Sequence, residues 1–230
     1  AYVWPEEPVL REQLEWFQDQ KLALMVHWGV YNQLGMVASW ALSDEDAEWS
    51  RKTVDWTDDG EVFKRQYRAL NRAFDPVAFQ PEEWAKMAKE CGFRYLILTT
   101  KHHDGFCLWD TAYTEYKTTA EDCPFHTHKY ADIVCAMFDA FRKEKLGIGV
   151  YYSKADWHCP DYWEKEKVFT GKTTRNPTYD PKENPEAWER FRAFTRDQIL
   201  ELGKQYGRLD ILWFDAGWVA ATNGQDIRLG

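Results

Sequence analysis

The sequence has 230 residues, the length of one large domain or two small ones, and it carries a formal net charge of −9. That acidic balance disfavours nucleic acid as a partner, because its phosphates would be repelled. No apolar stretch reaches the roughly 20 residues that a membrane span needs, so we expect no membrane partner. Five cysteines without a CxxC pair predict free thiols rather than a disulfide framework.

Four short apolar runs have the length and flanks of buried strands. Three stretches between them have helical patterns, each with a glycine near its end that suits a helix C-terminus. Strand alternating with helix predicts parallel strands and an α/β architecture. In chain order, the strand runs are residues 22–30, 93–100, 146–153 and 209–218, and the helical stretches are 81–92, 129–147 and 185–207.

Each apolar run becomes polar at its C-terminal end. In a (β/α)8 barrel the active site is built at that end of the strands. A doubly wound sheet also binds ligands there, but normally with a glycine-rich phosphate loop, and the sequence contains neither a GxGxxG nor a GxxxxGK motif. We therefore predict a (β/α)8 TIM-like barrel. The polar positions are, in order, His27, residues 101–104, residues 153–156 and Asp215.

Four strand–helix units use the whole chain, whereas a closed barrel needs eight strands in about 250 residues. We therefore expect residues 1–230 to form a catalytic barrel domain that lacks its C-terminal strands and helices. Residues 223–230 predict the start of another helix. Two long polar connections, 41–75 and 154–184, are expected to overhang the barrel mouth, because long loops in compact domains are usually functional.

Asp215 follows apolar residues at the end of the last strand run. Burying an ionised carboxylate is costly unless it is paired or hydrogen-bonded, so this position needs an explanation. One interpretation is an aspartate that caps the next turn. The other is a nucleophile that attacks the anomeric carbon of a sugar.

Three histidines stand at predicted strand ends. His27 alone fits a buried structural histidine as well as a site residue. His102 and His103 are adjacent, so on a regular strand they face opposite sides, and only a twist or bulge brings both into one site. Neutral imidazoles each offer a donor and an acceptor, which suits sugar hydroxyls.

A metal site is the competing interpretation. His126 and His128 have the spacing of one strand face, as in zinc hydrolases on barrels. The stretch that carries them contains a proline and has no apolar lead-in, so it predicts a loop. We expect no metal and no other cofactor.

Five motifs in this order and spacing resemble the α-L-fucosidases of glycoside hydrolase family 29. The third motif is specific, and the five together cover nearly the whole chain. They are MVHWGVY, AEWS, TKHHDGFCLWDT, GIGVYYS and LDILWFDAGW.

The resemblance implies a role for each matching residue. Asp215 matches the catalytic nucleophile of a retaining mechanism, which forms a covalent fucosyl intermediate. The general acid/base of the family is a glutamate well after that strand, and no glutamate follows Asp215 here, so none is identified in this chain. The residues that match or compete as sugar contacts are His27, His102, His103, Tyr151, Glu48, Trp49 and Trp40.

The predicted function is therefore hydrolysis of terminal α-L-fucose, with a fucosylated oligosaccharide or glycoprotein glycan as the partner. Two alternatives stay open, a carbohydrate-binding protein without turnover and a metal-dependent barrel hydrolase. The family suggests a secreted, periplasmic or lysosomal location, and an oligomer is possible.

Overall fold

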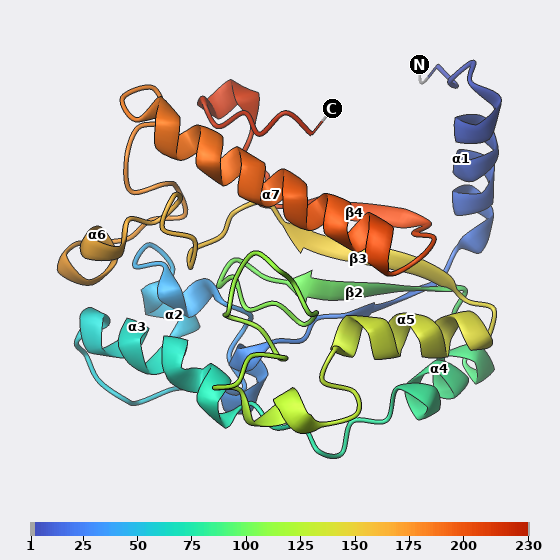
Figure 1. Cartoon of the computed structure of the whole chain (residues 1–230), viewed down its shortest axis with the longest axis horizontal. Coiled ribbons are helices and arrows are strands. Elements are labelled where there is room, and N and C mark those ends of the chain that lie inside the picture. Colours follow the sequence, from blue (N-terminus) through green and yellow to red (C-terminus); the bar gives the residue numbers. More distant parts are fainter. Residues whose placement is uncertain (1–2, 230) are drawn as a thin grey trace.

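The computed structural model describes residues 3–229. Its core is one sheet of four parallel strands in the order β1-β2-β3-β4, with every strand beside its neighbour in sequence (Figure 1). The strands are β1 (Ala23–Val26), β2 (Tyr95–Lys101), β3 (Gly147–Ser153) and β4 (Ile211–Asp215). Four parallel strands in sequence order, joined by helical crossovers, form an incomplete (β/α) barrel, as the alternation of strand and helix predicted.

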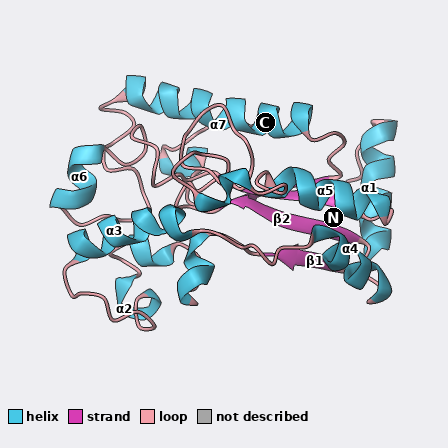
Figure 2. Cartoon of the chain, turned by 60° about the horizontal axis from the view of Figure 1, so that its bottom comes forward, coloured by secondary structure: helices cyan, strands magenta, loops and turns pink. Residues whose placement is uncertain are grey.

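Helices occupy the connections and lie around the sheet (Figure 2). α4 packs beside α5, and α5 also contacts β2 and β3. The helices are α1 (Pro8–Gln20), α2 (Ala47–Ser50), α3 (Gly60–Arg68), α4 (Pro81–Glu90), α5 (Ile133–Lys143), α6 (Lys165–Thr170) and α7 (Pro185–Gln205).

The helix ends follow local sequence signals. α4 begins at Pro81 and is followed by Gly92, whose φ of 83° lies in the left-handed region that glycine tolerates. α5 ends at Lys143, four residues before the predicted boundary at Gly147. Gly147 instead begins β3, where an added side chain would meet the ring of Trp16 at 3.0 Å.

Residues 224–229 form no helix, so the predicted helix start there was wrong; residue 230 lies outside the described part.

The two long connections contain short helices and are joined to each other. The backbone N–H of Thr173 donates to Oδ2 of Asp44 at 2.8 Å, and Arg175 donates to both carboxylate oxygens of Asp46 at 2.6 and 3.0 Å. These connections lie at the end of the sheet toward which the strands point (Figure 1). They are therefore in the expected place, beside the carboxyl ends of the strands.

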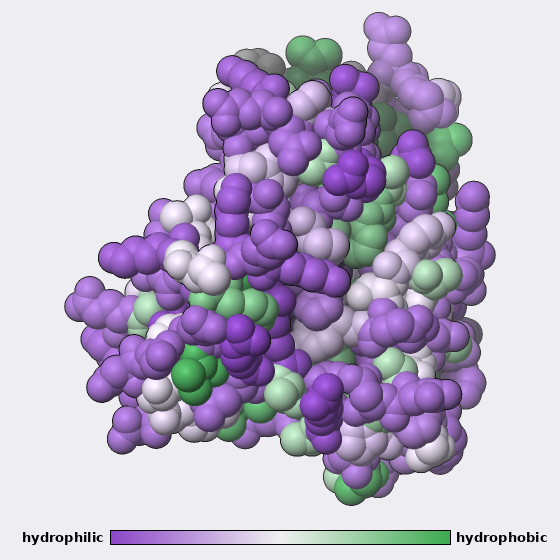
Figure 3. Space-filling model, turned by 60° about the vertical axis from the view of Figure 1, so that its left-hand side comes forward, coloured by the Kyte–Doolittle hydropathy of each residue, from purple (hydrophilic) through white to green (hydrophobic). Residues whose placement is uncertain are grey.

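The surface on that side of the molecule is mostly hydrophilic, with apolar residues in small separate groups (Figure 3). The five cysteines are all free thiols, as predicted. None of the helices within residues 3–229 combines the length and the apolar character that crossing a membrane requires.

Candidate active site

The carboxyl ends of the four strands bring together side chains from distant parts of the chain. His27 follows β1, His102 and His103 follow β2, Tyr151 lies on β3, and Asp215 ends β4. The ring centroids of His27 and His102 are 4.9 Å apart, and those of His27 and Tyr151 are 5.1 Å apart. The predicted strand-end residues therefore form one cluster.

Both adjacent histidines enter this cluster because the strand ends just before them. β2 ends at Lys101, after a register shift between Thr99 and Lys101. Beyond that point the alternation of strand faces no longer applies. The rings of His102 and His103 lie 3.9 Å apart, and both side chains are almost fully buried.

Each of the three histidines has its Nδ1 atom within hydrogen-bond distance of a hydroxyl group. The bond from His27 to Oγ1 of Thr99 is 2.8 Å long, and the bond from His103 to Oγ of Ser153 is 2.6 Å long. Nδ1 of His102 lies 2.5 Å from Oγ of Ser39. These contacts fix the ring planes, and Nε2 of each ring has no hydrogen bond with a residue of the described range 3–229.

The surroundings of the three imidazoles favour the neutral form. Burial lowers the pKa of His102 and that of His103 well below the usual value, and it lowers the pKa of His27 less strongly. A neutral ring is both a donor and an acceptor, so the cluster matches hydroxyl groups better than it matches anions.

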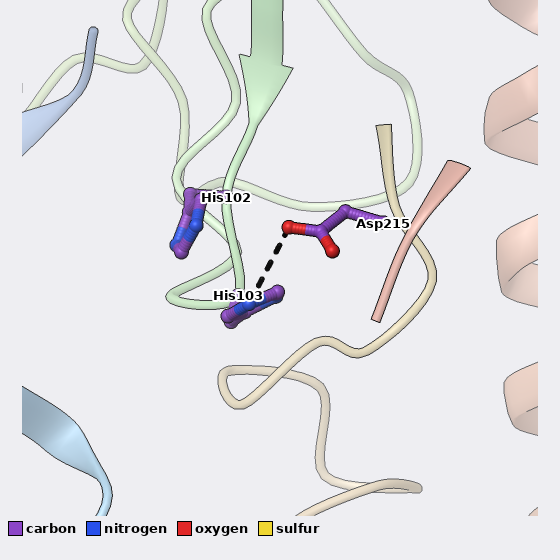
Figure 4. A group of neighbouring side chains, drawn as sticks. All are labelled: His102, His103 and Asp215. Carbon is purple, nitrogen blue, oxygen red and sulfur yellow. Dashed lines mark ion pairs between the residues drawn. The ribbon is translucent and has the colours of Figure 1, made fainter. Parts of the chain in front are cut away.

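Asp215 faces His103, with 3.8 Å between Oδ2 and Nε2 (Figure 4). The hydroxyl of Tyr151 donates to Oδ2, and the backbone N–H of Ala216 donates to Oδ1 at 2.6 Å. Burial and this bond to Asp215 raise the pKa of Tyr151, so the phenol stays protonated as a donor. The Asp215 carboxylate is therefore held by two donors, and its side chain remains 36% exposed.

Tryptophan rings form a wall beside His103. The ring centroid of Trp40 lies 4.8 Å from that of His103, and the centroids of Trp157 and Trp218 each lie 5.0 Å from it. The guanidinium group of Arg175 lies 4.9 Å above Trp40. Flat aromatic faces beside polar donors and acceptors are suited to a sugar ring.

Lys101, the last residue of β2, and Asp104, which follows the two histidines, bind side chains outside this cluster. Nζ of Lys101 lies 2.5 Å from Oδ2 of Asp156, and both side chains are buried. Asp104 accepts from the hydroxyl of Tyr67 at 2.8 Å and from the backbone N–H of Phe106 at 3.1 Å. Lys101 and Asp104 therefore belong to the framework behind the histidines.

The predicted loop contacts lie at different depths. Trp40 is packed among the site residues, as described above. Trp49 is 45% exposed, with its ring 6.3 Å from that of Trp40 and its Nε1 bonded to Asp46 at 3.1 Å. Glu48 is exposed on α2 and has no hydrogen bond or ion pair with the described residues.

His126 and His128 do not form a metal centre with other residues of the described part. Nδ1 of His126 bonds to the carbonyl of Cys123, and Nδ1 of His128 accepts from the backbone N–H of Tyr130. Within residues 3–229 the group that could hold a cation is His102, His103 and Asp215, whose ligand atoms lie within 4.8 Å of one another.

Several site residues were not found from the sequence. Ser153 closes the polar end of a predicted strand and could have been found there. Ser39 and Trp157 carry no local signal, because both reach the histidines from long connections. Among residues 3–229, the partners of the Asp215 carboxylate are Tyr151, Ala216 and His103, and none of them is a carboxylic acid. The general acid therefore stays unidentified.

Comparison with known proteins gives one consistent result. The family model described as "Alpha-L-fucosidase" matches residues 2–229. Tissue alpha-L-fucosidase of Rattus norvegicus is 27% identical over 216 residues, which are 93% of this chain and 42% of that protein. The chain thus spans about two fifths of the length of this curated relative.

Two solved structures are similar over nearly the whole chain. Alpha-L-fucosidase AlfC from Lactobacillus casei, in complex with alpha-L-fucose product, has a TM-score of 0.67 and 29% identity, and the match covers 94% of this chain and 64% of that one. The second structure is a trapped covalent intermediate of an alpha-L-fucosidase GH29 from Bacteroides thetaiotaomicron, in complex with 2-fluoro-fucosyl fluoride. Its TM-score is 0.64 at 29% identity, and the match covers 95% of this chain and 42% of that one.

Proposed function

The chain belongs to the α-L-fucosidase family, and on that premise we propose that its strand-end cluster is the sugar-binding and nucleophile-bearing part of a retaining α-L-fucosidase active site. Residues 1–230 would form part of one catalytic barrel domain. Its substrate would be a terminal α-L-fucose on an oligosaccharide or glycoprotein glycan. The observation that carries it is the position of Asp215, held by Tyr151 and Ala216 opposite three neutral histidines.

The chemistry of Asp215 supports a nucleophile. Its carboxylate receives two hydrogen bonds, which hold one orientation. The side chain is partly exposed, and Oδ2 lies 3.8 Å from Nε2 of His103. In the proposed reaction one carboxylate oxygen bonds to the anomeric carbon while the glycosidic C–O bond breaks. Water then attacks that carbon, releases fucose with retained configuration and regenerates the carboxylate.

The histidines would hold the ring during both steps. Their free Nε2 atoms match hydroxyl groups, and bonds that tighten as the ring becomes oxocarbenium-like lower the barrier. His27, His102, His103 and Tyr151 are proposed as the inner contacts, with Trp40 as a wall. Trp49 and Glu48 are proposed as outer contacts that reach the sugar only through movement of α2.

The test is hydrolysis of an aryl α-L-fucoside with a very good leaving group, which departs without acid assistance. We expect product formation, or a burst of one product per chain, in the wild type. Asp215→Ala should reduce the rate by at least about a thousandfold, as for the loss of other nucleophiles. Asp19→Ala, on the exposed face of α1, is the matched control.

Binding of fucose, followed by tryptophan fluorescence, separates the remaining outcomes. Binding without any burst would indicate a carbohydrate-binding protein and contradict the enzymatic part of the proposal. Equal rates in the wild type and Asp215→Ala would show that the nucleophile is another residue.

A further inference from the structure

The two adjacent histidines are tied to serines in chemically different ways. The backbone N–H of Ser39 points at Nδ1 of His102 with an N···N distance of 3.4 Å, and Oγ of the same serine lies 2.5 Å from that atom. A backbone N–H can only donate a hydrogen bond. Nδ1 of His102 is therefore the bare nitrogen, and this neutral ring carries its proton on Nε2.

The contact of His103 has the opposite polarity. Its Nδ1 lies 2.6 Å from Oγ of Ser153, and that hydroxyl donates to the carbonyl of Ala155 at 2.6 Å. A hydroxyl has one proton, so Ser153 must accept from His103. The proton of His103 is therefore on Nδ1, and its Nε2 atom is bare.

The bare Nε2 atom of His103 is buried and has no hydrogen-bond partner. It faces Oδ2 of Asp215 at 3.8 Å, so two lone-pair acceptors stand opposite each other. Buried acceptors without donors are costly, so this arrangement favours a group that brings a proton to them.

We propose that Ser39 and Ser153 hold His102 and His103 in opposite tautomers, so that the site presents one N–H donor and one bare nitrogen side by side. His102 donates to a ligand oxygen, and His103 accepts from a ligand hydroxyl. The two serines are positioning residues that set which hydroxyl group must donate and which oxygen must accept. The identity of the ligand as a sugar rests on the proposed function, whereas the tautomers do not.

The same assignment bears on the possible cation site. The lone pair of His102 is on Nδ1, where Ser39 already occupies it, and its Nε2 carries a proton. A divalent cation would then find ligands only in His103 and Asp215, fewer than the three or four protein ligands that a zinc site uses. The cluster is therefore better matched to a hydroxyl than to a metal ion.

Nitrogen NMR of the whole chain with labelled histidine tests the tautomers directly, because protonated and bare ring nitrogens resonate far apart. We expect a proton on Nε2 of His102 and on Nδ1 of His103, with signals assigned from single His→Gln variants. A proton on Nε2 of His103, a doubly protonated His103, or a proton on Nδ1 of His102 would each overturn the proposal.

Ser153→Ala is the informative variant. Without its acceptor, His103 should move its proton to Nε2 and donate to Asp215, while His102 stays unchanged. Ser153→Thr keeps the hydroxyl and should restore the original tautomer. Ser50→Ala is the control, since Ser50 is also buried but donates to the carbonyl of Asp46.

Calorimetry then links the tautomer to recognition. Ser153→Ala should weaken fucose binding about tenfold, the effect expected for one hydrogen bond. Fluorine cannot donate a hydrogen bond, so fucose analogues with one ring hydroxyl at a time replaced by fluorine identify the hydroxyl that donates to His103. At one ring position the replacement should weaken binding to the wild type but leave binding to Ser153→Ala unchanged. The same losses in both proteins would contradict the role of Ser153. A wild type that shows the expected tautomers but does not bind fucose would contradict the proposed function alone.

Discussion

The two middle strands of the sheet differ from the two outer strands in burial. Almost every residue of β2 and β3 is buried, and Leu98 on β2 has no exposed surface. On β4, Leu212 and Trp213 are 48% and 49% exposed, and Met25 on β1 is 43% exposed. The sequence predicts four buried strands, and for the outer two that prediction was wrong.

The difference has a simple cause. A middle strand has a neighbour on each side and helices over it, whereas each outer strand of the described sheet is paired on one side only. The histidine–aspartate cluster nevertheless needs the outer strands as well as the middle ones, because His27 follows β1 and Asp215 ends β4. Well-packed strands thus hold His102 and His103, while less covered strands carry the residues that complete the site.

The largest effect on stability is expected at the ion pair that joins the ends of the middle strands. Lys101→Met leaves Asp156 as a buried charge without its ion-pair partner, with only the backbone N–H groups of His158 and Cys159 as donors, which should lower the free energy of unfolding by about 3–5 kcal/mol. Urea unfolding measures this. Adding Asp156→Asn, which removes the charge but keeps an oxygen for the N–H groups of His158 and Cys159, should recover most of the loss, and a double variant as unstable as the single one would contradict the ion-pair explanation.

A smaller effect on stability distinguishes the packing of a middle strand from that of an outer strand. Leu98→Ala removes a fully buried side chain and should cost about 2–5 kcal/mol. Leu212→Ala, the same change at a half-exposed position, should cost less than about 1 kcal/mol. The two unfolding curves decide the matter, and equal losses would show that β4 is as well packed as β2.

The smallest effect is a change in the pH dependence of stability. Burial raises the pKa of Asp104 to about 7, with a further contribution from Asp156, against hydrogen bonds from Tyr67 and Phe106. A carboxyl pKa above the unfolded value means that the folded state binds more protons, so this group costs stability as pH rises from about 4 to 7. Asp104→Asn should therefore gain stability progressively relative to the wild type over that range, by about 1 kcal/mol for each pH unit.

Unfolding of Asp104→Asn and the wild type at several pH values provides the measurement. The lowered pKa values of the buried histidines make the folded protein less stable as pH falls. This effect is the same in both proteins, so the difference between their free energies of unfolding isolates the contribution of Asp104. A difference that stays constant between pH 4 and 7 would show that Asp104 is ionised throughout in the folded state.

Much of the site could be predicted because it follows from local pattern. The length and flanks of each apolar run identify the strands, and parallel strands end at one edge of a sheet, so His27, Asp215 and one of the two adjacent histidines were expected to be neighbours. The entry of both adjacent histidines could not be decided from the sequence, since it depends on the strand ending at Lys101.

The sequence by itself determined the α/β class, the order of the strands and the convergence of the polar strand ends, because these depend on residues close together along the chain. The tertiary structure decided which serine holds which histidine and which aspartate neutralises Lys101. Ser39 is 63 positions from His102, and Lys101 is 55 positions from Asp156. Contacts between residues so far apart form only when the chain has folded, and their hydrogen-bond polarity depends on atoms that no local pattern specifies.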